Sequence, residues 1–257
     1  MRRLLFADTY RLFHSRWFWL CLTGMLAMAV GFVMMQYTAM DYVVPLSRVV
    51  FLPMSFYGMM MAALISLFVG EDFSDGFIRN KIVAGRSRIS IYASNLLISW
   101  LACIVIYLIV TLFTMTIGSF FFENNITLNF LGKYLCLGIG MCIAYGCVYC
   151  SITMLCGDKV TATVICMGLA FLLLCVCLHT NQIMVQPEYK NGIPNPAYVE
   201  GTAKTVYAIL HDLNPSGQAA QLSTMNVFQP VRWLICDVGW VLATGVGMLS
   251  FQRKNIK

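Results

Sequence analysis

Charge is scarce in this sequence of 257 residues, because Asp, Glu, Lys and Arg together make up 11% of it. A soluble globular domain usually contains about a quarter charged residues. Hydrophobic residues reach 60%, and the mean hydropathy is +0.76. This balance leaves no room for a large soluble domain and indicates a chain that lies mostly within a membrane.

The sequence also lacks the common catalytic and nucleotide-binding motifs. No G-x-x-x-x-G-K-[ST] phosphate loop is present, since the pair Gly132-Lys133 has no upstream glycine at the required spacing. There is no H-E-x-x-H, no G-x-S-x-G and no pair of clustered carboxylates, and the three histidines are scattered. We therefore expect a protein that is not an enzyme and does not bind ATP through a phosphate loop.

Disulfides and metal sites are not expected either. The eleven cysteines lie within apolar runs or at their edges, whereas a secreted disulfide framework places cysteines in polar loops. Cys147-x-x-Cys150 resembles half of a zinc site, but no second pair and no histidine stand near it. We interpret the cysteines as small apolar packing residues and expect no bound cofactor.

Six apolar segments are long enough to span a bilayer, which requires roughly 20 residues. They are about 17–37, 49–69, a stretch within 89–122, 134–155, 160–180 and 232–251. The expected fold is therefore all-α, an integral membrane protein forming a single domain over residues 1–257. If both termini are cytoplasmic, twelve Lys and Arg residues lie on the inner side and five on the outer side. We attribute the net charge of +6 to this orientation and not to nucleic-acid binding.

Two segments outside the spans have helical patterns. In residues 1–16 and just beyond, Phe6, Tyr10, Phe13 and Trp17 form an aromatic stripe, which suits an interfacial helix on the inner leaflet. The alternative is a simple extension of the first span; a cleaved signal peptide is not expected. The long outer segment 181–231 opens with turn residues and continues with short helical pieces broken at Asn214-Pro215.

Residues 70–88, GEDFSDGFIRNKIVAGRSR, concentrate seven charges between two apolar spans. Ser74 or Asp75 is a candidate helix N-cap, and Gly85 a candidate helix end. On a helical wheel one broad side, interrupted by Lys81, carries Phe73, Phe77, Ile78, Ile82 and Ala84, and the other carries Asp72, Asp75 and Arg79. The segment thus predicts a short amphipathic cytoplasmic helix.

Two roles remain open for this helix. A purely topological signal requires Lys and Arg but not Glu71, Asp72 and Asp75, and such acids are poorly suited to anionic lipid. A helix with mixed charge and exposed phenylalanines is better suited to a protein partner. We therefore favour a docking role.

The region around this helix resembles the permease subunits of type-2 ABC transporters. Members often carry an acidic residue after the second span, then a Gly-Thr-Ile-Arg-Asn-like block, then Ser-Arg before the third span. The matching positions are Glu71, the block 76–80 (GFIRN) and Ser87-Arg88. Phe77 departs from the pattern, because a small residue is usual there. The six spans, the N-terminal helix, the long segment before the last span and the basic tail 251–257 also resemble this family.

The resemblance implies an exporter permease that works as a homo- or heterodimer in the cell membrane, with both termini cytoplasmic. It implies a separate cytoplasmic ATPase, two copies per complex, that holds ATP and Mg²⁺. It further implies that the outer segment forms short re-entrant helices and that 70–88 contains a coupling helix. The residues expected to couple to the ATPase are Glu71, Phe73, Phe77, Ile78, Arg79 and Lys81.

The sequence offers few candidates for a substrate path. Met54, Met59 and Met61 enrich the second span, where adaptable side chains suit either an apolar path or ordinary packing. Asp237 is the one acid within the last span, and it is open to interfacial solvation, an inter-helix hydrogen bond or a gating role. Small residues four apart form a packing stripe on the same helix, namely Gly239, Ala243 and Gly247.

Nearly uncharged spans favour an amphipathic substrate, such as an antimicrobial or cytolytic peptide, a lipid or a hydrophobic drug. A membrane-embedded enzyme or assembly factor is an alternative, but it requires converging polar side chains that the sequence does not offer. A secondary carrier is another, and it usually requires buried ionisable residues near the midplane.

Overall fold

The computed structural model describes residues 2–39, 44–190, 193–195, 198–225, 227 and 229–253. Over this part the chain is helical apart from one short hairpin, and six helical segments are long and apolar enough to cross a membrane. They are Arg16–Ala39, Leu46–Ser74, Arg88–Gly118, Leu128–Cys156, Lys159–Val185 and Pro230–Arg253. The predicted all-α architecture with six spans is confirmed at this level, and it indicates a multi-pass membrane protein.

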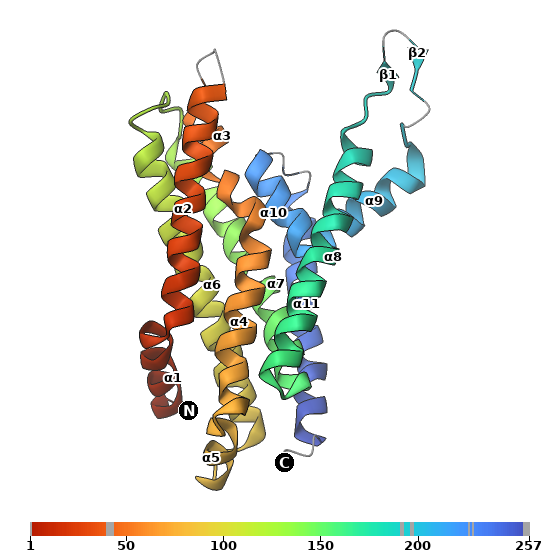
Figure 1. Cartoon of the computed structure of the whole chain (residues 1–257). Helices are drawn as coiled ribbons and strands as arrows, with labels where there is room; N and C mark the ends of the chain where they lie inside the picture. The colour runs from red at the N-terminus through yellow and green to blue at the C-terminus, as the bar shows by residue number, and fades with distance from the viewer. Residues whose placement is uncertain are drawn as a thin grey trace.

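The helices run roughly side by side in a bundle (Figure 1). We call one end of it the α5 end, because α5 (Phe77–Val83) lies there together with α1 (Arg2–His14) and the C-terminal end of α11 (Pro230–Arg253). The opposite end, with strands β1 (Tyr189–Lys190) and β2 (Ile193–Pro194), is called the hairpin end. The last four residues of the predicted basic tail, 254–257, lie outside the described residues.

The second span is broken near its start. It comprises α3 (Leu46–Val50), the 3-10 helix η1 (Leu52–Phe56) and α4 (Tyr57–Ser74). Pro53 lies at the beginning of η1, where its missing N–H group costs no helical hydrogen bond. The segment found is longer at both ends than the predicted span of about 49–69, because α3 begins at Leu46 and α4 continues into the charged segment as far as Ser74.

Helix α7 (Leu128–Cys156) lies at the centre of the bundle, between α4, α6 (Arg88–Gly118) and α11. Close approach to α6 depends on Gly138, because a Cβ at this position would collide with the Tyr107 ring. The hydroxyl group of Tyr107 donates to the backbone oxygen of Tyr134 at 3.0 Å. Cys147 and Cys150 are buried in the core as free thiols, which suits the packing role expected of them.

Helices α8 (Lys159–Val185) and α11 are the least buried of the six spans. The predicted small-residue stripe does not form one packing face within this chain. Gly247 packs against the Tyr92 hydroxyl and Ser151, whereas Gly239 has open space around it and Ala243 is exposed. Within this chain the buried face of α11 follows Trp233, Asp237, Thr244 and Gly247, so helix packing at Gly239 and Ala243 stays a prediction.

Two short helices follow the hairpin, α9 (Gly201–Leu213) and α10 (Pro215–Thr224). The predicted break at Asn214-Pro215 is confirmed. Asn214 caps α10 by accepting a hydrogen bond from the Ser216 backbone at 2.9 Å, and its amide donates to the Leu173 oxygen of α8 at 2.8 Å. Helix α10 is almost wholly buried among η1, α7 and α8. Its re-entry into a membrane stays a prediction.

Helix α1 is separate from the first span, α2 (Arg16–Ala39), because the helix is interrupted at Ser15. The alternative of a simple extension was therefore wrong. Asp8 and Leu12 face inward, while Phe6 and Tyr10 of the aromatic stripe are exposed. Placement of this stripe on the inner leaflet stays a prediction.

Candidate functional site

None of the acids of the charged segment belongs to the short helix α5, because Glu71 and Asp72 lie in α4 and Asp75 lies in the turn after it. Helix α4 ends at Ser74, and the chain reverses direction through Asp75 and Gly76. Gly76 has φ +72°, a left-handed conformation that favours glycine, and it precedes α5 directly. The predicted cap at Ser74 or Asp75 was wrong, because the turn at Gly76 separates these residues from α5.

The end of α5 agrees with the prediction. Gly85 has φ +78°, and its backbone N–H donates to the Ile82 oxygen at 2.9 Å. The Arg86 N–H donates to the Lys81 oxygen at 3.1 Å, which completes a Schellman motif. Helix α5 is thus a single short element fixed by glycine turns on both sides, and α6 begins at Arg88.

A buried ion-pair network attaches α5 to the bundle. Asp72, with 0% exposure, accepts from Arg11 of α1 and from Lys81 of α5, the latter at 3.2 Å. Lys81 also donates to Asp8 at 2.9 Å, and Asp8 accepts from the Ser94 hydroxyl of α6 at 2.7 Å. One network therefore joins α1, α4, α5 and α6. The predicted helical wheel, which placed Asp72 with Asp75 and Arg79 on one polar side, was wrong for Asp72, because this residue belongs to α4 and its basic partners draw it inward.

A second cluster joins α2 and α8 to α4 near the α5 end. Glu71 accepts from the Trp17 indole of α2 at 2.6 Å and from the Lys159 ammonium of α8 at 3.0 Å. The Lys159 ammonium also lies 5.2 Å from the centre of the Trp17 ring. Beside them, Gly70 allows the start of α8 to approach α4 closely, because a Cβ there would lie 3.0 Å from the Lys159 Cα. Glu71 thus holds α2, α4 and α8 together.

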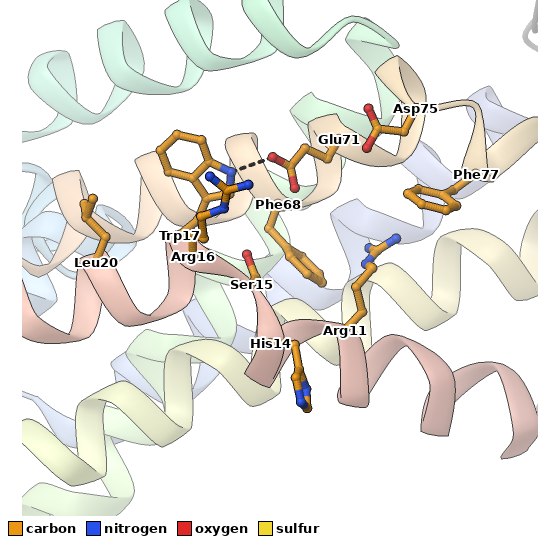
Figure 2. Close-up of a pocket in the computed structure, with 10 residues that line it drawn as sticks. All are labelled: Arg11, His14, Ser15, Arg16, Trp17, Leu20, Phe68, Glu71, Asp75 and Phe77. Carbon is orange, nitrogen blue, oxygen red and sulfur yellow. Dashed lines mark hydrogen bonds between the residues drawn. The ribbon is translucent and has the colours of Figure 1, made fainter.

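A pocket of about 670 Å³ opens between α1, α2, α4 and α5. Figure 2 shows Glu71 and Asp75 on the α4 side and Arg11 reaching from α1 toward Phe77. The Arg11 guanidinium lies 4.5 Å from the centre of the Phe68 ring and 5.5 Å from that of Phe77. The complete lining is Arg11, His14, Ser15, Arg16, Trp17, Leu20, Phe68, Glu71, Asp75 and Phe77. This pocket offers both signs of charge beside aromatic surface.

The predicted coupling residues separate into two groups. Phe77, at 42% exposure, and Arg79 are accessible on the outside of the molecule. Ile78 is buried and Phe73 is half-buried against the core, so both pack against this chain itself. Glu71 and Lys81 are held by the ion pairs described above. Ile78 was among the predicted coupling residues, and its burial shows that this prediction was wrong.

Beside Arg79, the outer surface of α5 includes two residues that the sequence reading missed, Val83 and Arg86. Arg79, Val83 and Arg86 are exposed, and Val83 is 81% accessible. Arg79 and Val83 lie four residues apart on one face of the helix, a signal that was present in the sequence, whereas Arg86 lies beyond the end of α5, directly after Gly85. We call Phe77, Arg79, Val83 and Arg86 the α5 surface.

The candidate path residues are mostly internal. Met54 and Met61 are fully buried in the core, and Met59 is half-buried. Asp237 is buried and accepts from the Gln218 amide of α10 at 2.9 Å, so interfacial solvation was the wrong alternative and an inter-helix hydrogen bond is present. Arg232, near the start of α11, pairs with Asp212 of α9.

Two ionisable groups outside the spans have shifted pKa values. The Thr161 backbone N–H and hydroxyl both donate to Asp158 and lower the pKa of this exposed carboxyl group. Burial lowers the pKa of His211 in α9, and the neighbouring Asp212 partly opposes this shift. His211 lies beside the Thr180 hydroxyl, with 2.9 Å between Nδ1 and Oγ1.

Comparison with protein-family models finds no match to this chain, and comparison with curated proteins finds none either.

Proposed function

We propose that this chain is the transmembrane permease subunit of an ATP-driven ABC exporter, and that the α5 surface contacts a separate cytoplasmic ATPase. The proposal rests on one observation: the short helix α5 exposes several side chains and is at the same time attached to the bundle by ion pairs. Phe77, Arg79, Val83 and Arg86 face outward, while Lys81 of the same helix is anchored in the buried ion-pair network.

Rigid attachment suits a coupling element. A force on the α5 surface would pass to α4 through the tight turn at Gly76 and to α6 through Gly85 and Ser87. The Lys81–Asp8 pair would carry the same displacement to α1. Packed elements transmit such displacements because they have little free volume to absorb them.

The pocket beside α5 supports a protein partner. Glu71 and Asp75 would attract a basic side chain, and Arg11 with Arg16 an acidic one, so a loop carrying both charges fits the pocket. The aromatic rings of Phe68 and Phe77 supply apolar contact area next to these charges. This mixed character is less suited to a lipid surface, which carries mostly negative charge.

The substrate in this proposal is amphipathic: an antimicrobial or cytolytic peptide, a lipid or a hydrophobic drug. The exposed apolar sides of α8 and α11 offer surface for a second permease chain or for lipid. Between them and α7 lies a small, mainly apolar pocket of about 230 Å³, which includes Trp240 and Ala243. It is a suitable place for an apolar side chain of a substrate or of the second chain.

The proposal is tested by purifying the chain from native membranes in mild detergent and measuring ATP hydrolysis and the amount of ATP-binding subunit retained. Phe77→Asp combined with Arg79→Glu should remove most of both signals. Leu128→Asp, at an even more exposed apolar position of the hairpin end, should leave them unchanged. Unchanged binding in the double variant would contradict the role of α5, and transport that follows an ion gradient without nucleotide would favour a secondary carrier instead.

A further inference from the structure

Asp237 differs from the other buried acids that the structure describes. Asp8, Asp72 and Asp212 each form an ion pair with Lys or Arg. Asp237 is 6% exposed and has no basic partner among the described residues. An ionised carboxylate buried in a membrane span without a counter-charge is energetically costly. Something must therefore compensate the negative charge or remove it.

The hydrogen bonds around Asp237 show that the site has more acceptors than donors. Both N–H groups of the Gln218 amide are used, one on the Asp237 Oδ1 and one on the Asp212 backbone oxygen, each at 2.9 Å. Within the described part of the chain, the Asp237 Oδ2 and the Gln218 Oε1 are buried and have no hydrogen-bond partner. Both are acceptors, so the pair lacks one donor.

We infer that Asp237 is a proton-binding site: its carboxyl group is protonated in this structure and joins α10 to α11. A proton on Oδ2 supplies the missing donor and removes the buried charge in one step. With this proton the Asp237 carboxyl group both accepts from the Gln218 amide at Oδ1 and carries a donor at Oδ2, and the carbonyl oxygen of the same Gln218 amide is a buried acceptor without a partner among the described residues.

A proton fits this site better than a metal ion. The Asp237 Oδ2 lies against the backbone of α7 at Gly140, where even a Cβ would collide with it. A bound cation requires several oxygen ligands around it, and the described residues contain no cluster of three metal-binding side chains. A proton requires no such space.

The neighbouring groups do not supply a counter-charge. Arg232 is already paired with Asp212. The ionisable groups facing Asp237 from the surrounding helices are Cys142 and Cys147 of α7, Cys236 and Arg232 of α11, and Asp212 of α9. The thiols are neutral and Asp212 is acidic, so the Asp237 proton is the local means of neutralisation.

If α10 moves away from α11, Asp237 meets water, where a carboxyl group ionises at neutral pH. Movement of the outer segment would then release one proton per chain.

Infrared spectroscopy of the purified chain in lipid vesicles at pH 7 tests this inference. We expect a carbonyl stretching band of a protonated carboxyl group that disappears in Asp237→Asn and persists in Asp75→Asn, an exposed acid of the same chain. In Gln218→Leu the band should shift, because the hydrogen-bond partner is lost, which gives a second readout if Asp237→Asn folds poorly. A wild-type spectrum without an Asp237-dependent protonated band would overturn the inference.

Hydrogen–deuterium exchange tests the link to α10. Raising the pH from 7 to 9 should increase exchange in residues 215–224 of the wild type beyond the intrinsic effect of pH. Asp237→Asn keeps an uncharged donor at this position and should remove the additional increase. Equal pH dependence in both proteins would refute the joining role. Neither measurement involves ATP or a partner, so a failure here leaves the proposed function standing.

Discussion

Lys81 on the short helix α5 donates to Asp72 near the end of α4, with 3.2 Å between Nζ and Oδ2. The two residues are nine positions apart in the chain but belong to different helices. The glycine turn between the two helices folds α5 back so that this contact forms. The same ammonium group reaches Asp8 of α1 at 2.9 Å. This one residue therefore determines how firmly the α5 surface is attached to the bundle.

Replacement of Lys81 should loosen the α5 end. Lys81→Met should lower the free energy of unfolding in detergent by roughly 3 kcal/mol, the lower end of the range for a broken buried ion pair, because Arg11 still pairs with Asp72. Thermal unfolding at pH 7 measures this loss. Arg79→Met, an exposed change on the same helix, should alter the stability by less than about 0.5 kcal/mol. Equal effects of the two changes would contradict the network.

The sequence predicted the spans well because apolar length is a local property. It also identified Gly85 as the end of α5 and Asn214-Pro215 as a break, since both depend on the conformational preferences of adjacent residues. Pro53 could have indicated the break in the second span, but the prediction considered only the length of the apolar run.

The inward position of Asp72 was not predictable in this way. Its partner Arg11 lies 61 residues earlier in the chain, and residue type alone favours an exposed aspartate. The same holds for Asp237, whose hydrogen-bond partner Gln218 belongs to a helix that packs into the bundle from the outer segment. Tertiary contacts between distant helices decide both positions.

The turn before α5 should depend on glycine. Gly76→Ala should cost about 1–2 kcal/mol, because a side chain disfavours the left-handed conformation at φ +72° even though the space around it is open. Gly132→Ala is the matched control: it lies within helix α7, also in open space, and should be neutral or stabilising by about 0.5–1 kcal/mol. Thermal unfolding of both variants in the same detergent compares them, and a neutral Gly76→Ala would refute the assigned turn.

The stability of the outer segment should fall in mild acid. Burial lowers the pKa of His211 in the folded chain. Below about pH 6.5 the unfolded chain therefore binds a proton at this residue that the folded chain does not bind. Above that pH the imidazole is neutral in both states and contributes no pH dependence. As the pH falls below 6.5 the folded state therefore loses stability, until His211 also becomes protonated in the folded chain.

The variant His211→Asn isolates this effect. The difference in unfolding temperature between wild type and variant, measured from pH 8 to pH 5, should be constant above about pH 6.5 and should change in favour of the variant below it. A difference that does not vary with pH would show that His211 is not the group responsible.

Photo-crosslinking tests the central claim, contact between the α5 surface and an ATPase, most directly. A photoreactive amino acid is placed at Val83, which is 81% exposed on α5, or at Leu128, which is 85% exposed at the hairpin end, and native membranes are irradiated. The account predicts that position 83 is linked to an ATP-binding subunit and position 128 is not. Linkage of position 83 to lipid alone, or the same products from both positions, would contradict it.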